Sequence, residues 1–224
     1  MTKKQIIKKT EEYVKKCMKA LPPNVHDFKH VDRVRKWAIK IAKDEKRDVF
    51  LAEMAALLHD VGRTKENPPK ILHTDIGAKM AYQFLTKNKL ISKKETEEVT
   101  YAVANHGRGG QGWLVNITQD ADKLDGLGAI GLMRGIQGTH ILPEYINSQG
   151  NEKTIWKSGE ATKILRKQKH VGNSVIENLN FQISWYQNIH TKSAKKIATP
   201  LIQFMKEYIK QFKKELKQNK YAKI

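Results

Sequence analysis

Hydrophobic positions along this chain recur at spacings of three and four residues, the period of an amphipathic helix. In the first such stretch, apolar side chains follow this period through residues 6–21 and stop at "LPPN". No stretch alternates apolar and polar residues for long enough to build a sheet. The pattern therefore predicts an all-α fold, with helices over about 27–44, 47–59, 74–86 and 92–106, from 113 onward, and again after a looser stretch at about 138–155.

Local signals predict where several of these helices begin and end. Asp27 is suited to cap the second helix, and "SKKE" at 92–95 reads as a capping box. The glycine-rich "GLGAIGLMRGI" is predicted to continue the sixth helix and to pack tightly. Pro200 lies inside the last apolar stripe, which predicts a kink or a break there.

The 224 residues contain no internal repeat and no linker, so we expect one domain over 1–224, with a core of about 20–210 and a basic C-terminal helix and tail. No stretch approaches the roughly 18 apolar residues of a membrane span, and the start of the chain lacks an apolar signal region. Cys17 is the single cysteine. These features favour a cytoplasmic protein with no membrane contact.

The formal net charge of +19 favours contact with phosphates or other polyanions. Most of this charge is lysine scattered over helix surfaces, whereas nucleic-acid readout typically uses arginine and aromatic side chains gathered in a patch. A small phosphorylated ligand is therefore the favoured partner. Nucleic acid is the less favoured one, and the oligomeric state is left open.

Four polar residues fall among apolar positions on three predicted helices: His30, His59, Asp60 and Asp122. Burying such groups costs free energy unless a partner satisfies them. Each alone fits a hydrogen-bonded core histidine, a cap or a turn residue. Together, imidazoles and carboxylates suit a divalent metal with open coordination positions, where bound water becomes a nucleophile near neutral pH.

The stretches "HDFKHVDRVRKWA" (26–38), "EMAALLHDVGR" (53–63), "HTDIGAKMA" (73–81) and "DADKLDGLGAIG" (120–131) resemble the HD-domain metal-dependent phosphohydrolase superfamily. The resemblance is closest to its small single-domain bacterial branch, the YedJ-like proteins, and covers roughly residues 20–210. It implies an all-α HD-domain bundle and a divalent ion, which could be Mn, Fe, Co, Ni, Zn or Mg. The implied ligands are His30, His59, Asp60 and Asp122.

The same resemblance implies further site residues. Arg33 matches an arginine that follows the first histidine and could hold a phosphate, as could Lys123 beside the last aspartate. Related two-metal members carry extra histidines, so His73 and His106 could bind a second ion with a bridging Asp60. Either histidine could instead be a general acid, or could simply favour a helix end.

Other features receive plainer interpretations. "GRGGQG" (107–112) is no P-loop, because no Gly-Lys-Ser/Thr follows it, and is predicted to form a lip that offers Arg108 to a phosphate. Gly62 is expected to let the chain turn away from the metal. The remaining histidines have no comparable sequence neighbourhood, and no role is expected for His26, His140, His170 and His190.

The function that these observations favour is hydrolysis of a phosphomonoester or phosphodiester, with a nucleotide as the expected substrate class. In this scheme Asp60, His106, Arg33 and Lys123 carry the chemistry. Two alternatives stay open. One is a di-iron oxygenase on the same fold, which would need both His73 and His106 as ligands. The other is a non-catalytic basic helical module that binds nucleic acid.

Overall fold

The computed structural model describes residues 1–19, 21, 26–66, 72–139, 142–145 and 174–218. Within these residues every regular element is a helix, and the prediction of an all-α fold is confirmed. The chain divides into two compact units, the first comprising 1–125 with 189–194 and the second comprising 126–188 with 195–224. The expectation of a single domain stays a prediction.

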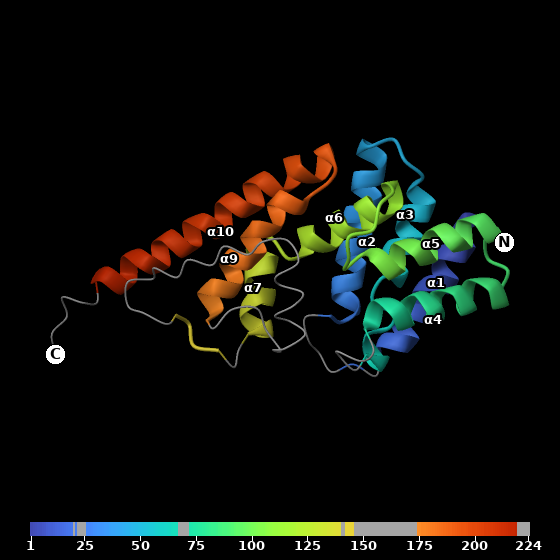
Figure 1. Ribbon diagram of the computed structural model, residues 1–224, viewed down its shortest axis with the longest axis horizontal. Helices are drawn as coiled ribbons and strands as arrows, with labels where there is room; N and C mark the ends of the chain where they lie inside the picture. The colour runs from blue at the N-terminus through green and yellow to red at the C-terminus, as the bar shows by residue number, and fades with distance from the viewer. Residues whose placement is uncertain (20, 22–25, 67–71, 140–141, 146–173, 219–224) are drawn as a thin grey trace. The chain divides into compact units, whose positions relative to one another are not determined.

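The first unit is organised around a short, almost fully buried helix, α3. Helix α3 packs against α1, α2, α5 and α6, and α4 lies beside α5 (Figure 1). A helix that is apolar on all sides is typically buried at the centre of a bundle. The "AALL" run of α3 gives the end of this helix such an all-round apolar surface. The helical elements of this unit are α1 (Lys3–Met18), α2 (Phe28–Asp44), α3 (Val49–Leu58), η1 (Arg63–Lys65), α4 (His73–Lys87), α5 (Lys93–Asn105) and α6 (Trp113–Asp125).

Side-chain caps fix the starts of the helices that carry the polar residues. Asp27 accepts the backbone N–H of His30 at 3.1 Å and so caps α2, as predicted. Ser92 and Glu95 form the predicted capping box at the start of α5. Asp48 caps α3 in the same way. Each such cap stabilises a helix by about 1 kcal/mol and fixes where its first turn lies.

In the second unit α7 (Gly128–Gly138) packs against α9 (Val175–Ser184), which continues into η2 (Trp185–Asn188). The prediction that the sixth helix continues through "GLGAIGLMRGI" is wrong, because α6 ends at Asp125 and Gly128 adopts a φ of +69°. That conformation suits glycine and interrupts a right-handed helix. The predicted tight packing is confirmed at Gly135, where an added Cβ would lie 2.9 Å from Leu179 Cδ2.

Helix α10 (Lys192–Gln218) runs through Pro200 without interruption, so the predicted break is wrong, while the alternative, a kink, stays a prediction. Pro200 is exposed, and water can satisfy the carbonyl that its missing N–H would have bonded. No helix among the described residues is long and apolar enough to cross a membrane. The predictions for residues 146–155, for the tail at 219–224, and for His140 and His170 lie outside the described residues.

Candidate metal centre

The buried carboxylate of Asp60, directly after α3, lies between two pairs of histidines. Its Oδ2 is 3.6 Å from the Nε2 atoms of both His30 and His59. Its Oδ1 is 3.5 Å from Nε2 of His73 and 3.6 Å from Nε2 of His106. All five side chains belong to the first unit, and each carboxylate oxygen therefore faces its own imidazole pair.

The hydrogen bonds of His30 and His59 fix which ring nitrogen carries the proton. His59 Nδ1 lies 2.7 Å from the carbonyl oxygen of Ala56, and His30 Nδ1 lies 2.7 Å from Asp125 Oδ2. Both partners are acceptors, so both Nδ1 atoms donate, and Nε2 is the nitrogen of each neutral ring that can bind a cation. These two Nε2 atoms are 3.3 Å apart. Two lone pairs at this distance repel unless a proton or a metal ion lies between them.

The other pair repeats this arrangement. His106 Nδ1 donates to the carbonyl oxygen of Val103 at 2.8 Å, and His73 Nδ1 donates to Glu66 Oε2 at 3.0 Å. Their Nε2 atoms are again 3.3 Å apart. Outward hydrogen bonds from Nδ1 to a carboxylate or a backbone carbonyl are the usual support of metal-binding histidines, because they fix both tautomer and ring orientation.

Asp122, on α6, adds a second carboxylate to the first pair. Its Oδ1 lies 3.4 Å from His30 Nε2, and its side chain is 33% exposed, so the cluster reaches solvent on this side. Two histidines with carboxylates form a donor set that suits divalent transition metals. Three groups of residues each bring their ligand atoms within 4.8 Å of one another: His26, His30 and Asp60; His30, His59 and Asp122; Asp60, His73 and His106.

The electrostatic environment keeps these ligands in the form that binds a cation. Burial lowers the pKa of His59 to about 4, and burial also lowers the pKa of His73. Burial alone would raise the pKa of Asp60, but the guanidinium of Arg63 and the surrounding imidazoles outweigh it and hold this pKa well below its usual range. At neutral pH these shifts keep His59 and His73 neutral and Asp60 ionised, which are the forms that bind a metal.

Arg33 reaches the cluster through Asp125, a residue that the sequence analysis missed. Arg33 donates from Nε to Asp125 Oδ1 at 2.6 Å and from a terminal nitrogen to Oδ2 at 3.1 Å. Asp125 in turn accepts the proton of His30 Nδ1. The guanidinium of Arg33 therefore binds the carboxylate of Asp125, which supports the proposed ligand His30. The spacing of Asp125, three residues after Asp122 on one helix face, is the signal that could have identified it.

His26 also belongs to this neighbourhood, which corrects the interpretation that it has none. Its Nδ1 lies 3.1 Å from Asp60 Oδ2, and burial lowers its pKa to about 4. The four-residue spacing from His30 was the available signal. His190, by contrast, binds elsewhere in the unit: its Nε2 lies 2.8 Å from Gln119 Oε1 and its N–H donates to Asp120 at 2.9 Å.

Gly62 is required for a reason other than the expected turn. Its φ is −82°, a value open to any residue. A Cβ at this position would lie 2.2 Å from the carbonyl oxygen of His73 and 2.6 Å from the backbone nitrogen of Gly77. The absence of a side chain lets the start of α4 approach the chain that follows Asp60, and this approach brings His73 to the carboxylate.

Lys123 and Arg108, the other residues expected to hold phosphate, have protein partners in the structure. Lys123 Nζ lies 3.5 Å from Gln119 Oε1, and burial lowers its pKa. Arg108 donates to Asp75 Oδ2 at 2.6 Å, and both side chains of this pair are exposed. Their roles toward a phosphate stay predictions.

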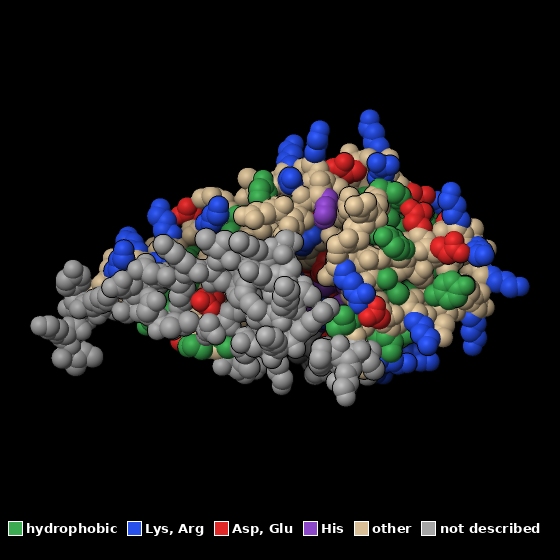
Figure 2. All heavy atoms as spheres, viewed as in Figure 1, with side chains coloured by type: hydrophobic (Ala, Val, Ile, Leu, Met, Phe, Trp, Pro, Cys, Tyr) green, Lys and Arg blue, Asp and Glu red, His purple; other side chains and the backbone are tan. Residues whose placement is uncertain are grey.

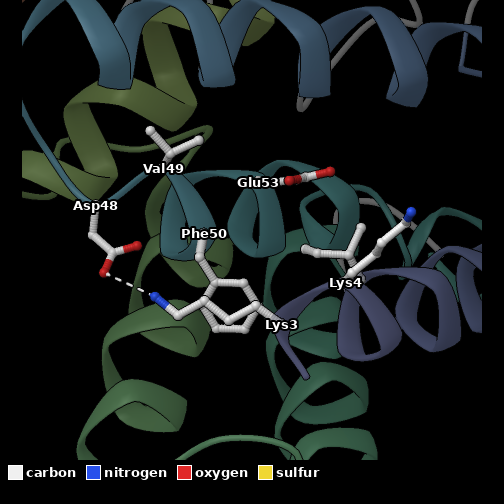
Figure 3. A pocket seen from close by; sticks show the side chains of 7 residues that line it. Lys3, Lys4, Asp48, Val49, Phe50 and Glu53 are labelled. Carbon is white, nitrogen blue, oxygen red and sulfur yellow. Dashed lines mark ion pairs between the residues drawn. The ribbon is translucent and has the colours of Figure 1, made fainter. Parts of the chain in front are cut away.

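A separate surface hollow lies between the starts of α1 and α3 (Figure 3). Lys3 crosses it, with Nζ 3.9 Å from Asp48 and 4.9 Å from the centre of the Phe50 ring. None of the histidines or carboxylates of the cluster lines this hollow. Over the visible face, the described Lys and Arg side chains are spread among acidic ones rather than gathered in one patch (Figure 2).

Comparison with known proteins identifies relatives of this chain. Residues 27–127 match the HD domain family. YpgQ of Bacillus subtilis strain 168 is 28% identical over 118 residues, which span 49% of this chain and 55% of that relative.

Solved structures share the fold over nearly the whole length. The crystal structure of Bacillus subtilis YpgQ in complex with ADP has a TM-score of 0.72 at 22% identity, covering 96% of this chain and 97% of that one. An HD-superfamily hydrolase from Bacillus thuringiensis has a TM-score of 0.70 at 28% identity, covering 96% and 98% of the two chains.

Proposed function

We propose that this chain, a member of the HD-domain superfamily through residues 27–127, is a phosphohydrolase that cleaves a phosphate ester of a nucleotide. The HD domain and the HD-superfamily hydrolase among its neighbours support the coarser description, a metal-dependent hydrolase. The ADP bound by YpgQ supports a nucleotide ligand. The observation that carries the proposal is the arrangement around Asp60, with an imidazole pair facing each of its oxygens through Nε2.

The proposed ligands of a first ion are His30, His59, Asp60 and Asp122, which are the residues that the sequence analysis selected. For a second ion the proposed ligands are Asp60, His73 and His106, because their ligand atoms also converge. A divalent ion at such a site lowers the pKa of water and polarises a phosphoryl oxygen. The donor set fits several divalent metals, and the proposal names none of them.

The protein's own groups prepare the reaction. Asp125 keeps the proton of His30 on Nδ1 and leaves Nε2 free for a ligand role. Arg33, bonded twice to Asp125, becomes a positioning residue in this proposal rather than the phosphate ligand first expected. Lys123, next to Asp122, remains the proposed cation for the phosphate. His106 is proposed as a ligand of the second ion, in preference to a general acid, because its Nδ1 proton is committed to a carbonyl.

A di-iron oxygenase remains a second candidate, since the His73–His106 pair supplies the extra ligands that it would need. Iron in the purified protein together with a visible absorption band of the oxidised form would favour it. Hydrolysis of phosphate esters by the Mn²⁺-loaded, colourless protein would favour the phosphohydrolase.

The decisive experiment compares D60A with D44N. Asp44 serves as the control, because it is an exposed carboxylate that pairs with Lys40 and belongs to none of the three ligand groups. Metal content after purification without chelator and rates on a panel of nucleotides and other phosphoesters are measured, with circular dichroism to check folding. D60A should keep its helix content and lose both metal and activity. Full activity in D60A would refute the proposal.

A further inference from the structure

The two halves of the cluster differ in charge. The half built on His30 and His59 has Asp122 in addition to the shared Asp60. Among the described residues, the half built on His73 and His106 has only the shared carboxylate as an acidic ligand. An arginine, moreover, lies on this second half.

Arg63 is that arginine, and it occupies the oxygen that a second ion would use. Its Nε donates to Asp60 Oδ1 at 2.9 Å, and this is the oxygen that faces His73 and His106. A terminal nitrogen of Arg63 lies 3.5 Å from both carboxylate oxygens of Glu66. The side chain is 19% exposed, so its charge is poorly screened.

With neutral imidazoles, the charged side chains that contact the two histidine pairs carry an excess of negative charge. Four carboxylates (Asp60, Glu66, Asp122 and Asp125) accept hydrogen bonds or face the imidazoles, and two guanidinium groups (Arg33 and Arg63) bind them. One divalent ion would neutralise the excess of negative charge. A second would leave the cluster positive, which is unfavourable at this burial unless an anion enters with it.

We propose that Arg63 makes the second metal position conditional on phosphate. The His30–His59–Asp122 half takes a divalent ion on its own. The His73–His106 half takes one only together with a phosphate anion, because the anion restores the negative charge that Arg63 cancels at Asp60 Oδ1. Selection of phosphorylated substrates then arises in the metal centre itself. This inference rests on the proposed function, since it treats the cluster as a metal centre.

Titration of the metal-free protein with Mn²⁺ tests the proposal without any turnover. Electron paramagnetic resonance of free Mn²⁺ gives the number of ions bound and their affinities, with and without inorganic phosphate. We expect one Mn²⁺ to bind without phosphate and a second to bind at least about tenfold more tightly when phosphate is present, a size typical of groups that contact metal ligands. Two equal sites that ignore phosphate would overturn the inference.

Two variants separate the charge of Arg63 from a structural role. R63Q should bind the second Mn²⁺ about tenfold or more tightly without phosphate and should lose most of the phosphate dependence. R35Q is the matched control, because Arg35 is 20% exposed and paired with Glu11, and it should titrate like the unmodified protein. A purely structural Arg63 would lower the melting temperature of R63Q and leave its phosphate dependence intact, which would overturn the inference.

Two further outcomes are decisive. Should R63Q fail to fold by circular dichroism, the titration of the unmodified protein decides alone. Should the unmodified protein bind no Mn²⁺, Co²⁺ or Zn²⁺ at all, the proposed function falls and the role of Arg63 falls with it. Metal binding without phosphate linkage overturns only the role of Arg63.

Discussion

Replacing Gly62 with alanine should damage one half of the cluster and spare the other. The new Cβ would lie 2.2 Å from the carbonyl oxygen of His73 and 2.6 Å from the backbone nitrogen of Gly77, whereas ordinary contacts begin at 3.4 Å. Both neighbours are backbone atoms, so the start of α4 must move by roughly 1 Å. Overpacking of this kind costs about 1–3 kcal/mol. In a chain of this length that lowers the melting temperature by roughly 2–12 °C.

The displacement also has a chemical consequence, because α4 begins at His73 and its movement withdraws Nε2 from Asp60 Oδ1. Binding of a second metal ion should weaken while binding at the His30–His59 half persists. Misplacement by about 1 Å can cost a hundredfold in rate. Calorimetry and Mn²⁺ titration measure the two effects. G109A is the control, since a Cβ at Gly109 would meet nothing within 4 Å. Equal stability and equal metal binding in the two variants would refute this explanation of Gly62.

Three further predictions follow from the site. Because burial lowers the pKa of His59 to about 4, the unfolded chain takes up a proton first as the pH falls from about 6.5. His59 alone should therefore cost the metal-free protein roughly 3 kcal/mol of stability between pH 6.5 and 4, and the lowered pKa values of His26 and His73 add to this loss. Urea unfolding in chelator at several pH values measures the loss, and a flat profile would contradict it. R33Q removes the bidentate partner of Asp125 and should lower the affinity for the first Mn²⁺ ion by about 10–100-fold, and R33K should restore this affinity only in part. Equilibrium dialysis measures the affinity, and an unchanged value would rule out the positioning role of Arg33. R108A breaks only an exposed ion pair with Asp75, so the melting temperature should barely change. If Arg108 binds the phosphate of the substrate, KM for a phosphorylated substrate should rise, and unchanged kinetics would argue against this role.

Much of the fold follows from local information in the chain. The three-and-four spacing predicts the helices of the first unit, and the caps at Asp27 and Ser92 mark their starts, because these signals operate within a few residues. Local signals mislead where context overrides them. Pro200 is accommodated on an exposed helix face, and Gly128 ends a run that periodicity alone would continue.

The site residues also fall into those that the sequence could identify and those that depend on contacts between distant segments. His30, His59, Asp60 and Asp122 could be selected from the sequence, since polar ligand types among apolar positions are visible there. His26, Arg63 and Asp125 could not be assigned with the same force, because their roles arise from contacts between segments far apart in the chain.

Periodicity and residue type along the chain are enough to predict an all-α protein with an HD-type set of histidines and aspartates at the ends and faces of its helices. Contacts between distant segments place Asp60 between two imidazole pairs, turn the Nε2 atoms of these pairs inward, and give the two halves different charge through Arg63 and Asp122. The physical reason is that periodicity and capping act along the chain, whereas charge balance and tautomer depend on which groups meet through space.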